Sequence, residues 1–399
     1  MAVRKRTLRQ VDFAGKRAFV RVDFNVPLRD GAITDDTRIR AAVPTLQAIL
    51  AAGGSVVAAS HLGRPKGKAV DALRLKPVAE RLRALLPGVE VRYVTDVAGP
   101  EAAAAAAELR AGEVLLLENL RFEPGETEND KDLAARLAAL ADVFVEDAFG
   151  ACHRAHASTA ALPGLLKPAV AGLLLEREIE AFHRIMDVPR RPVVAVIGGA
   201  KVSDKLPVLQ SLLQRAQVLL IGGGMAYTFL AAKGIEVGGS LLEEDRIDAA
   251  RAVLAAALRA RVRLLLPTDH VIADAFADDA AFRVVEGAIP KGWMGLDIGP
   301  ATQHAYRLIL AGAGTVVWNG PMGVFEMSAF REGTLTVARA VADSDAVSVV
   351  GGGDSVAAIA MAGVTERIGF VSTGGGAFLE MLEGKQLPGI AALDDAPAA

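Results

Sequence analysis

Arginine and histidine side chains follow several short apolar runs in the first half of this 399-residue chain. A guanidinium can hold two oxygens of a phosphate or a carboxylate at once, and it stays charged at neutral pH. Pairing with a surface carboxylate is the simpler interpretation of any one arginine. Several arginines at strand ends, with histidines beside them, favour a pocket for a small polyanion. The residues just after these runs, together with Arg38 further downstream, are Asp23, Phe24, Asn25, Arg38, His61, Leu62, Gly63, Arg64, Asn119, Arg121, His153, Arg154 and His156.

Glycine-rich segments follow the apolar runs of the second half. Glycine allows backbone N–H groups to approach a phosphate closely, and a helix N-terminus that follows favours negative charge. One such loop often serves only to let a helix pack against a sheet. Five of them in one half favour a nucleotide site instead. They are GGAKVSDK (198–205), GGGMAYTF (222–229), WNGPMGVFE (318–326), GGGDS (351–355) and STGGGA (372–377).

Three charged residues in these loops suit a metal–nucleotide complex. Lys201 and Lys205 are four residues apart, so on a helix following the first loop they would share one face. Asp354 follows three glycines. Mg²⁺ is commonly held by one or two carboxylates together with the phosphates of a nucleotide, so we expect Asp354 to be the metal-contacting residue.

The apolar runs predict the elements that position these residues. They are 18–22, 55–59, 91–94, 114–117 and 143–145 in the first half, and 193–197, 218–221, 262–266, 315–318, 347–350 and 368–371 in the second. Continuous Val, Ile and Leu without alternation indicate parallel strands buried on both faces. Helical segments such as 101–110 and 244–260 separate them. We therefore expect an α/β protein with two doubly wound, Rossmann-like parallel-sheet domains joined by a helix.

The pattern also predicts the domain boundaries. Residues 172–187 have apolar positions at helical spacing and are followed by prolines, which favours an interdomain helix. The first domain, 1–171, would bind the small anion, and the second, 188–386, the nucleotide. Residues 387–399 are expected to pack back on the first domain.

Composition narrows the possible partners. The net charge is −3, and the first 170 residues carry 24 Lys and Arg against 21 Asp and Glu. That balance is too weak for a nucleic-acid surface, and no apolar stretch is long enough for a membrane span. The single cysteine, Cys152, and a start without an apolar signal core indicate a cytoplasmic protein. A nucleophilic Cys152 assisted by His153 or His156 is a disfavoured alternative. The remaining histidines, His183, His270 and His304, are interpreted as structural.

Taken together, these segments resemble the phosphoglycerate kinase family from end to end. The matching blocks are VRVDFNVP (20–27), SHLGRPKG (60–67), LLENLRF (116–122), EDAFGACHRAHAS (146–158), GGAKVSDK (198–205), GGGMAYTF (222–229), LDIGP (296–300), WNGPMGVFE (318–326), GGGDS (351–355) and the segment 371–393. Departures are slight: Ala151 and Cys152 replace the usual Thr-Ala, Phe378 stands where Ser is common, and Ser355 replaces the commoner Thr.

The resemblance implies reversible transfer of a phosphoryl group from 1,3-bisphosphoglycerate to ADP, giving 3-phosphoglycerate and ATP. It implies that Arg38 and Lys201 stabilise the transferring group, and that Asp354 contacts Mg²⁺. It places Asp23, Phe24, Asn25, Arg38, His61, Leu62, Gly63, Arg64, Arg121 and Arg154 in the phosphoglycerate pocket, and Lys201, Lys205, Gly295, Asn319, Glu326, Gly352, Gly353, Asp354 and Ser355 in the nucleotide site.

Two other functions would share some of these features. A two-lobed solute-binding protein would have a hinge and an anion pocket but would carry an export signal. Another acyl-phosphate kinase would share the chemistry but not these blocks. We expect a monomeric enzyme with small-molecule substrates that closes about a hinge at 172–187, because each site lies on its own domain.

Overall fold

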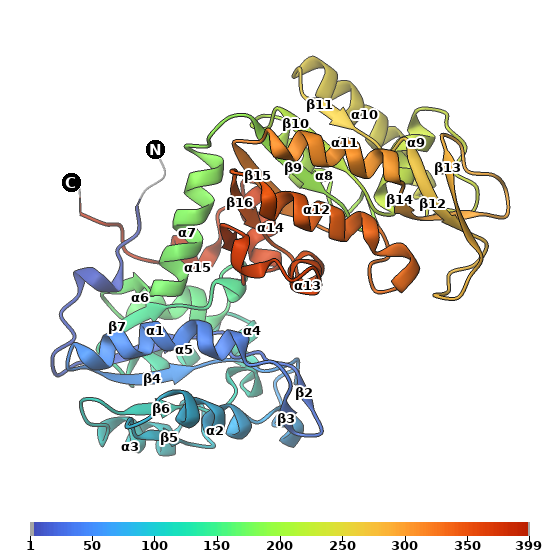
Figure 1. The fold of residues 1–399 in the computed structure, drawn as a ribbon. Coiled ribbons are helices and arrows are strands. Elements are labelled where there is room, and N and C mark those ends of the chain that lie inside the picture. Colours follow the sequence, from blue (N-terminus) through green and yellow to red (C-terminus); the bar gives the residue numbers. More distant parts are fainter. Residues whose placement is uncertain (1–3, 398–399) are drawn as a thin grey trace. The chain divides into compact units, whose positions relative to one another are not determined.

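The computed structural model describes residues 4–397, which form two compact units (Figure 1). The first unit consists of the chain up to Ile179 together with the segment from Gln386 onward, and the second is Glu180–Lys385. Helix α7, Leu173–Met186, contains the point at which the chain passes from one unit to the other. Among the described residues, no helix combines the length and hydrophobicity needed to cross a bilayer.

The first unit is built on a six-stranded sheet with the order β5-β6-β4-β1-β7-β8. All neighbouring strands are parallel. The strands are β1 (Arg17–Arg21), β4 (Ser55–Ala59), β5 (Val91–Tyr93), β6 (Val114–Leu116), β7 (Val143–Glu146) and β8 (Ala169–Ala171). The helices include α1 (Thr37–Ala51), α2 (Lys76–Leu85), α3 (Pro100–Ala107), α4 (Pro124–Thr127), α5 (Lys131–Ala138), α6 (Leu162–Leu165) and α15 (Pro388–Ala391). A short hairpin pairs β2 (Leu28–Arg29) with β3 (Ala32–Ile33).

The second unit is built on another six-stranded sheet, with the order β11-β10-β9-β15-β16-β17 and every pair parallel. Its strands are β9 (Val193–Ile197), β10 (Val218–Ile221), β11 (Arg263–Leu265), β15 (Thr315–Asn319), β16 (Val347–Val350) and β17 (Phe370–Val371). Its helices are α8 (Leu206–Leu212), α9 (Met225–Ala232), α10 (Ile247–Arg259), α11 (Pro300–Ala311), α12 (Glu332–Asp343), α13 (Gly353–Met361) and α14 (Gly376–Leu382).

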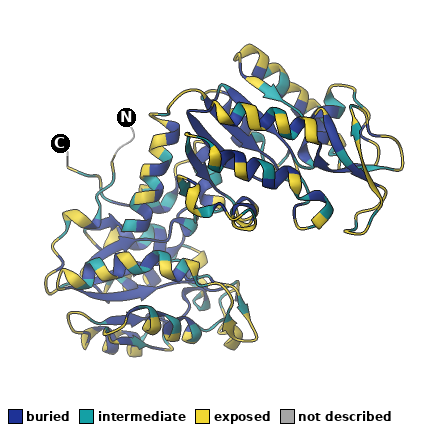
Figure 2. Cartoon of the chain, viewed as in Figure 1, coloured by how far each residue is buried: buried dark blue, intermediate teal, exposed yellow. Residues whose placement is uncertain are grey.

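The central strands are buried along their whole length, as Figure 2 shows in dark blue. Every residue of β4, β9 and β15 is buried. Consecutive side chains of a strand point to opposite faces, so burial at every position requires both faces of the sheet to be covered. The predicted fold class, two doubly wound parallel-sheet domains joined by a helix, is confirmed. The strands of the two large sheets agree with the apolar runs to within about two residues, except for the edge strand β8, which was not predicted.

A small antiparallel sheet in the second unit was not predicted. It pairs β12 (Asp269–Ala273) with β13 (Phe282–Glu286) and β14 (Met294–Ile298). Strand β13 is largely exposed, so it lacks the continuous apolar run used to find the other strands. The apolar residues of β12 and β13 form runs of only two or three, which are too short to separate from a loop.

The segment after Gln386 is joined to the rest of the first unit by several hydrogen bonds. The Gly389 N–H donates to the Cys152 carbonyl at 2.9 Å, and the Asp394 carboxylate accepts from the Ala169 N–H at 2.9 Å and from Lys167 Nζ at 2.5 Å. A Cβ atom at Gly389 would lie 2.9 Å from the Cys152 Cα, so this close approach requires glycine.

Candidate functional site

The predicted anion-binding residues of the first unit follow three neighbouring strands. Asp23 and Asn25 follow β1, His61 and Gly63 follow β4, and Arg121 follows β6. The sheet order places β6, β4 and β1 side by side. Ligands of open α/β sheets bind outside the carboxyl ends of the strands, which is where these residues lie.

Hydrogen bonds connect these loops to one another. The Gly63 N–H donates to Asn25 Oδ1 at 2.9 Å, and Arg121 Nη1 donates to the Gly63 carbonyl at 2.6 Å. Arg38, in the first turn of α1, donates from Nη1 to Asp23 Oδ2 at 2.8 Å. The Asp23 carboxylate therefore holds a half-buried guanidinium in place without covering it. The structure brings Asp23, Asn25, Arg38, Gly63 and Arg121 together.

Asn119 ties two of these loops together. Its Oδ1 accepts from the Leu62 and Arg121 N–H groups, each at 3.1 Å, and its Nδ2 donates to the Leu62 carbonyl at 2.7 Å. Phe24 and Leu62 are buried core residues. They shape the loops from beneath and offer no polar side chain to a ligand.

The cluster is strongly positive. Burial lowers the pKa of His61 well below its usual value, and the guanidinium groups of Arg21, Arg121, Arg38 and Arg154 lower it further. Burial, followed by the charges of Arg154 and Arg21, lowers the pKa of Arg121 to about 10, which leaves it charged at neutral pH. Several cations within interaction range of one neutral imidazole create a potential suited to an anion.

The two remaining predicted arginines differ in their surroundings. Arg154 is partly buried, and its Nε donates to His153 Nε2 at 3.0 Å. Its charge acts on both His61 and Arg121, so it belongs to the cluster. Arg64 is exposed. Within residues 4–397 its guanidinium has no hydrogen bond or ion pair, so the structure places it beside the cluster only through its neighbour Gly63.

A cavity of 630 Å³ lies over the glycine-rich loops of the second unit. The wall includes Gly199 and Ala200 after β9, Gly223 and Gly224 after β10, and Pro321, Gly323 and Val324 after β15. Leu241, Phe276, Met294 and Met327 make one part of the wall apolar, and the predicted residues Gly295, Glu326 and Asp354 also line it. An apolar wall beside exposed backbone N–H groups suits a base and its phosphates.

Close approach of side chains to the backbone explains why glycine is needed at two of the predicted nucleotide-site positions. A Cβ at Gly295 would lie 2.1 Å from the Tyr227 hydroxyl oxygen. Gly352 has a φ of +97°, and a Cβ there would meet Asn319 Nδ2 at 2.5 Å. Larger residues at either position would displace the neighbouring side chain, and at Gly352 they would also strain the backbone.

Asn319 connects three of the predicted nucleotide-binding segments. Its Oδ1 accepts a very short hydrogen bond from Lys205 Nζ, and its Nδ2 donates to the Gly351 carbonyl at 2.6 Å. The Ser355 hydroxyl accepts from the Gly320 N–H at 2.6 Å, so the first turn of α13 is fixed against the end of β15. Burial lowers the pKa of Lys205. The structure thus brings Lys205, Asn319, Gly352 and Ser355 together.

The predicted helix bearing both Lys201 and Lys205 is wrong. Helix α8 begins at Leu206, with Lys205 as its N-cap residue and Pro207 in its first turn. Proline is tolerated in the first turn of a helix but not further inside, so Pro207 fixes where the helix begins. Lys201 lies upstream in the loop after β9 and is exposed. The two lysines therefore do not share a helix face.

Asp354 and Gly353 are exposed at the start of α13. No group of three or more His, Cys, Asp or Glu that could hold a metal occurs among the described residues. A single exposed carboxylate at the cavity wall fits a metal that takes its other ligands from nucleotide phosphates and water. It would not hold a bare ion tightly.

The structure argues against a nucleophilic cysteine. Cys152 is completely buried, and its Sγ lies 3.5 Å from the Ala148 carbonyl. Burial raises the pKa of the thiol well above its usual value, and the nearby Glu146 raises it further. A reactive cysteine needs the opposite environment, because the thiolate is the nucleophile.

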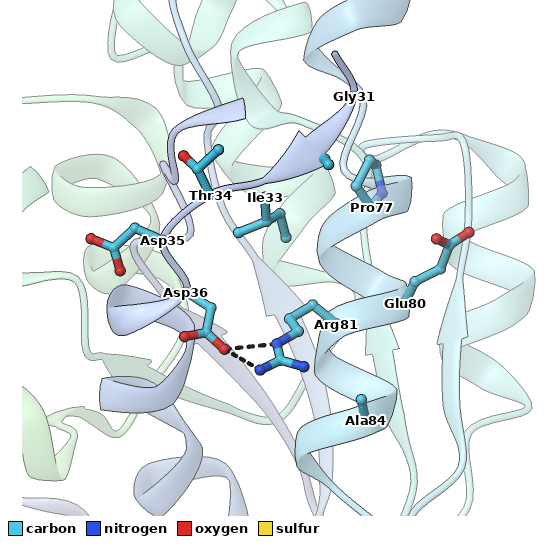
Figure 3. Close-up of a pocket in the computed structure, with 10 residues that line it drawn as sticks. Gly31, Ile33, Thr34, Asp35, Asp36, Pro77, Glu80, Arg81 and Ala84 are labelled. Atoms are coloured by element: carbon cyan, nitrogen blue, oxygen red, sulfur yellow. Dashed lines mark hydrogen bonds and ion pairs between the residues drawn. The ribbon is translucent and has the colours of Figure 1, made fainter. Parts of the chain in front are cut away.

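Two features of the sites were missed from the sequence. One is Arg21, which contacts His61. A charged residue within an apolar run could have drawn attention to it in the sequence. Tyr227, Leu241 and Phe276 line the nucleotide-sized cavity, but apolar residues far apart in sequence give no such signal. Another cavity, of 730 Å³, lies between the β2–β3 hairpin and α2, where Asp36 pairs with Arg81 (Figure 3). None of the predicted site residues lines it.

An arginine cluster on one α/β unit and a glycine-lined cavity on another are the features of an enzyme that transfers phosphoryl groups between small molecules. Comparison with known proteins agrees. Residues 8–385 match the family model for phosphoglycerate kinase. The phosphoglycerate kinase of Roseiflexus castenholzii is 55% identical over 394 residues, which cover 98% of this chain and 100% of that protein. That of Moorella thermoacetica is 57% identical over 392 residues, covering 98% and 99%.

Solved structures show the same likeness. Phosphoglycerate kinase from Coxiella burnetii has a TM-score of 0.90 and 43% identity, covering 97% of this chain and 98% of that chain. The enzyme from Pyrococcus horikoshii has a TM-score of 0.81 and 35% identity, with the same coverage. The chain belongs to the phosphoglycerate kinase family. It is a phosphotransferase whose acceptor is a carboxyl group.

Proposed function

We propose that the chain carries out the phosphoglycerate kinase reaction with one substrate on each unit. In that reaction a phosphoryl group moves reversibly from 1,3-bisphosphoglycerate to ADP, giving 3-phosphoglycerate and ATP. The observation that carries this assignment is the arginine cluster around His61, combined with the family match. We assign the phosphoglycerate to that cluster and the nucleotide to the glycine-lined cavity.

The residues of the first unit would bind and orient the phosphoglycerate. Arg121, Arg154 and Arg64 supply charge for its phosphate and carboxylate, while Asn25 and His61 supply neutral hydrogen-bonding groups. The carboxylate that accepts the phosphoryl group is already ionised at pH 7, so no general base is needed. This agrees with a cluster that is rich in arginine and uses the Asp23 carboxylate to hold Arg38.

The transferring group gains negative charge that must be stabilised on all sides. Arg38 is suited to this because its guanidinium is half exposed while one nitrogen is held by Asp23. Lys201 is suited to it because it is exposed directly after the glycine loop of β9. Lys205, Asn319, Gly352, Gly353 and Ser355 would hold the nucleotide phosphates, and Gly295 and Glu326 would lie near the base and ribose.

Mg²⁺ bound together with the nucleotide would neutralise phosphate charge, and Asp354 is the residue that would contact it. The side chain leaves room for this role, because it is exposed and lines the cavity wall. We further propose that the enzyme is a monomer, since the two sites described need no residue from another chain, and that it is cytoplasmic, which agrees with its single, buried cysteine.

Transfer requires the reacting atoms to come within roughly 3–3.5 Å of each other. We propose that binding of both substrates closes the units about α7 and its flanks and expels water that could hydrolyse the acyl phosphate. Small-angle scattering tests this. The radius of gyration should fall with both ligands together and change much less with either alone, and an unchanged radius in the ternary complex would contradict closure.

The reaction itself is tested by a coupled assay that follows ADP formation from ATP. We expect turnover only when 3-phosphoglycerate and Mg²⁺ are both present. Acetate and other simple carboxylates, offered in place of 3-phosphoglycerate, form the specificity control. Equal turnover with acetate would assign the chain to a different acyl-phosphate kinase, and tight binding without turnover would indicate a binding protein.

A further inference from the structure

Arg21 is a fully buried arginine at the last position of β1. Its sequence neighbours Val20 and Val22 belong to the core of the first unit. Burying a guanidinium is costly unless its N–H groups find partners. The position therefore calls for an explanation beyond packing, since an apolar residue would serve the core better.

Each nitrogen of the Arg21 guanidinium has a hydrogen-bond partner. Nε donates to Ser158 Oγ at 2.9 Å, and Nη1 donates to the Val22 carbonyl at 2.5 Å. Nη2 lies 3.1 Å from Nδ1 of His61. A guanidinium has only donors, so Nδ1 of His61 must be the acceptor in this contact. A neutral imidazole that accepts at Nδ1 carries its hydrogen on Nε2.

We propose that Arg21 is a positioning residue for the reaction, holding His61 as a neutral imidazole that presents its Nε2–H to the phosphoglycerate. The proposal rests on the assignment of His61 to the phosphoglycerate site. Arg21 itself is buried and acts through His61 without touching the substrate.

A second layer of buried groups holds Arg21 in this position. The Ser158 hydroxyl donates to Glu126 Oε1 at 2.6 Å, and the Ser158 N–H donates to Glu126 Oε2 at 3.0 Å. Glu126 is fully buried, and its Oε1 lies 3.7 Å from Nδ1 of His156. The carboxylate thus fixes the hydroxyl that fixes the guanidinium, and the guanidinium fixes the imidazole.

The charges around the pair favour the same protonation state. Arg21, Arg121, Arg38 and Arg154 all oppose a positive charge on His61, and burial opposes it most. Two buried carboxylates, Glu126 and Glu146, also interact electrostatically with Arg21. Without Arg21, Nδ1 would lose its donor and the imidazole would lose its nearest cation. The ring would then be free to turn and would take up a second proton more readily.

The first test is ¹⁵N NMR of histidine-labelled wild-type enzyme at pH 7, with the His61 signals identified from their absence in His61→Gln. We expect hydrogen on Nε2 and none on Nδ1. A proton on Nδ1, alone or together with one on Nε2, would overturn the proposal. This measurement needs no substitution at Arg21, so it can overturn the proposal even if variants at that buried position fail to fold.

The second test compares Arg21→Met with Arg17→Met, a control on the same strand. Arg17 bonds to the Ala106 carbonyl and pairs with Asp142, away from His61. In Arg21→Met we expect a raised pKa of His61 and a KM for 3-phosphoglycerate increased about tenfold or more at pH 8. The KM ratio to wild type should shrink towards pH 6, where the protonated ring recovers a donor.

The control variant should leave both the His61 signals and the KM ratio unchanged. Ser158→Ala, which releases only Nε of Arg21, should give a smaller effect in the same direction. A KM ratio for Arg21→Met that does not vary with pH, with the His61 pKa unmoved, would show that Arg21 is only structural. Failure of the proposed function would look different, because the wild-type enzyme would then not respond to 3-phosphoglycerate at all.

Discussion

The two units carry candidate sites at equivalent places, the carboxyl ends of parallel strands, but they build them from different groups. In the first unit the polar atoms belong to side chains, among them Arg38, His61 and Arg121. Asp23 holds the Arg38 guanidinium, and Asn25 and Asn119 hold the loops after β4 and β6. In the second unit the wall of the cavity combines apolar side chains with backbone that is exposed by glycines after β9, β10 and β15. Both arrangements suit anions, one by fixed charges and the other by N–H groups and helix N-termini.

This difference should appear in how each site responds to change. A site built from side chains loses affinity for its anion when an arginine is removed or replaced by lysine. A backbone site tolerates the loss of one side chain better, but it cannot accept a Cβ where the chain must pass closely, as at Gly352. Single substitutions in each unit should therefore affect activity and binding in different ways.

Arg38→Ala should give the largest loss, with kcat reduced on the order of 10³-fold, because it removes the positive charge that we propose stabilises the transferring phosphoryl group. Arg38→Lys should recover only part of the activity, since a lysine ammonium cannot make the paired hydrogen bonds of a guanidinium. Steady-state kinetics with both substrates measure this. Full activity in the lysine variant would contradict the bidentate role.

Lys201→Ala should lower kcat roughly 10²–10³-fold and change KM for ATP much less. The lysine is exposed after the glycine-rich loop, so its loss removes a charge without changing the backbone of that loop. Lys233→Ala, at the C-terminal end of α9, is the matched control and should behave as wild type. A kcat for Lys201→Ala within about threefold of wild type would show that this lysine is structural.

Asp354→Asn should raise the Mg²⁺ concentration needed for half-maximal rate by about tenfold, since one carboxylate ligand becomes a neutral amide. The affinity for 3-phosphoglycerate should stay the same, because the arginine cluster is on the other unit. Rates across a magnesium titration at fixed ATP measure the first quantity. Addition of a chelator should abolish turnover in both proteins. An unchanged magnesium requirement would remove Asp354 from the metal site.

The smallest effect concerns stability. Burial raises the pKa of Asp147 to about 7, although hydrogen bonds from Thr45 and from the Leu175 and Leu174 N–H groups lower it. The unfolded chain loses this proton near about pH 4. Between these values the folded state binds more protons, so rising pH weakens the folded state.

Asp147→Asn should lack this contribution. Its melting temperature relative to wild type should therefore rise between about pH 4 and pH 7 and level off above the folded pKa. Thermal unfolding of both proteins at several pH values measures the difference. A difference that does not depend on pH would show that Asp147 stays ionised across this range.

Much of this arrangement could be predicted from the sequence, and the failures have identifiable causes. Parallel strands buried on both faces leave long apolar runs, so the two large sheets and the residues after their strands could be located. Lys201 and Lys205 were misplaced because four-residue spacing suggests a helix, whereas Pro207 delays its start. The antiparallel sheet around β12 has an exposed strand and leaves no such run.

The contacts that complete the sites could not be predicted. The bond between Arg21 and His61 joins residues 40 positions apart, and the bond from Lys205 to Asn319 joins residues 114 apart. Spacing along a chain gives no information about such pairs. The apolar wall formed by Tyr227, Leu241 and Phe276 depends in the same way on how loops fold over the sheet.

The division of labour between the units is tested most directly by titration calorimetry of two variants with two ligands. Arg121→Ala should weaken 3-phosphoglycerate binding by about tenfold or more and leave Mg–ADP binding unchanged. Gly352→Ala should do the reverse, because its Cβ would meet Asn319 in a strained backbone conformation. We expect each variant to lose affinity for the ligand of its own unit and to keep its affinity for the other ligand. An equal loss of affinity for both ligands in either folded variant would contradict the assignment of one substrate to each unit.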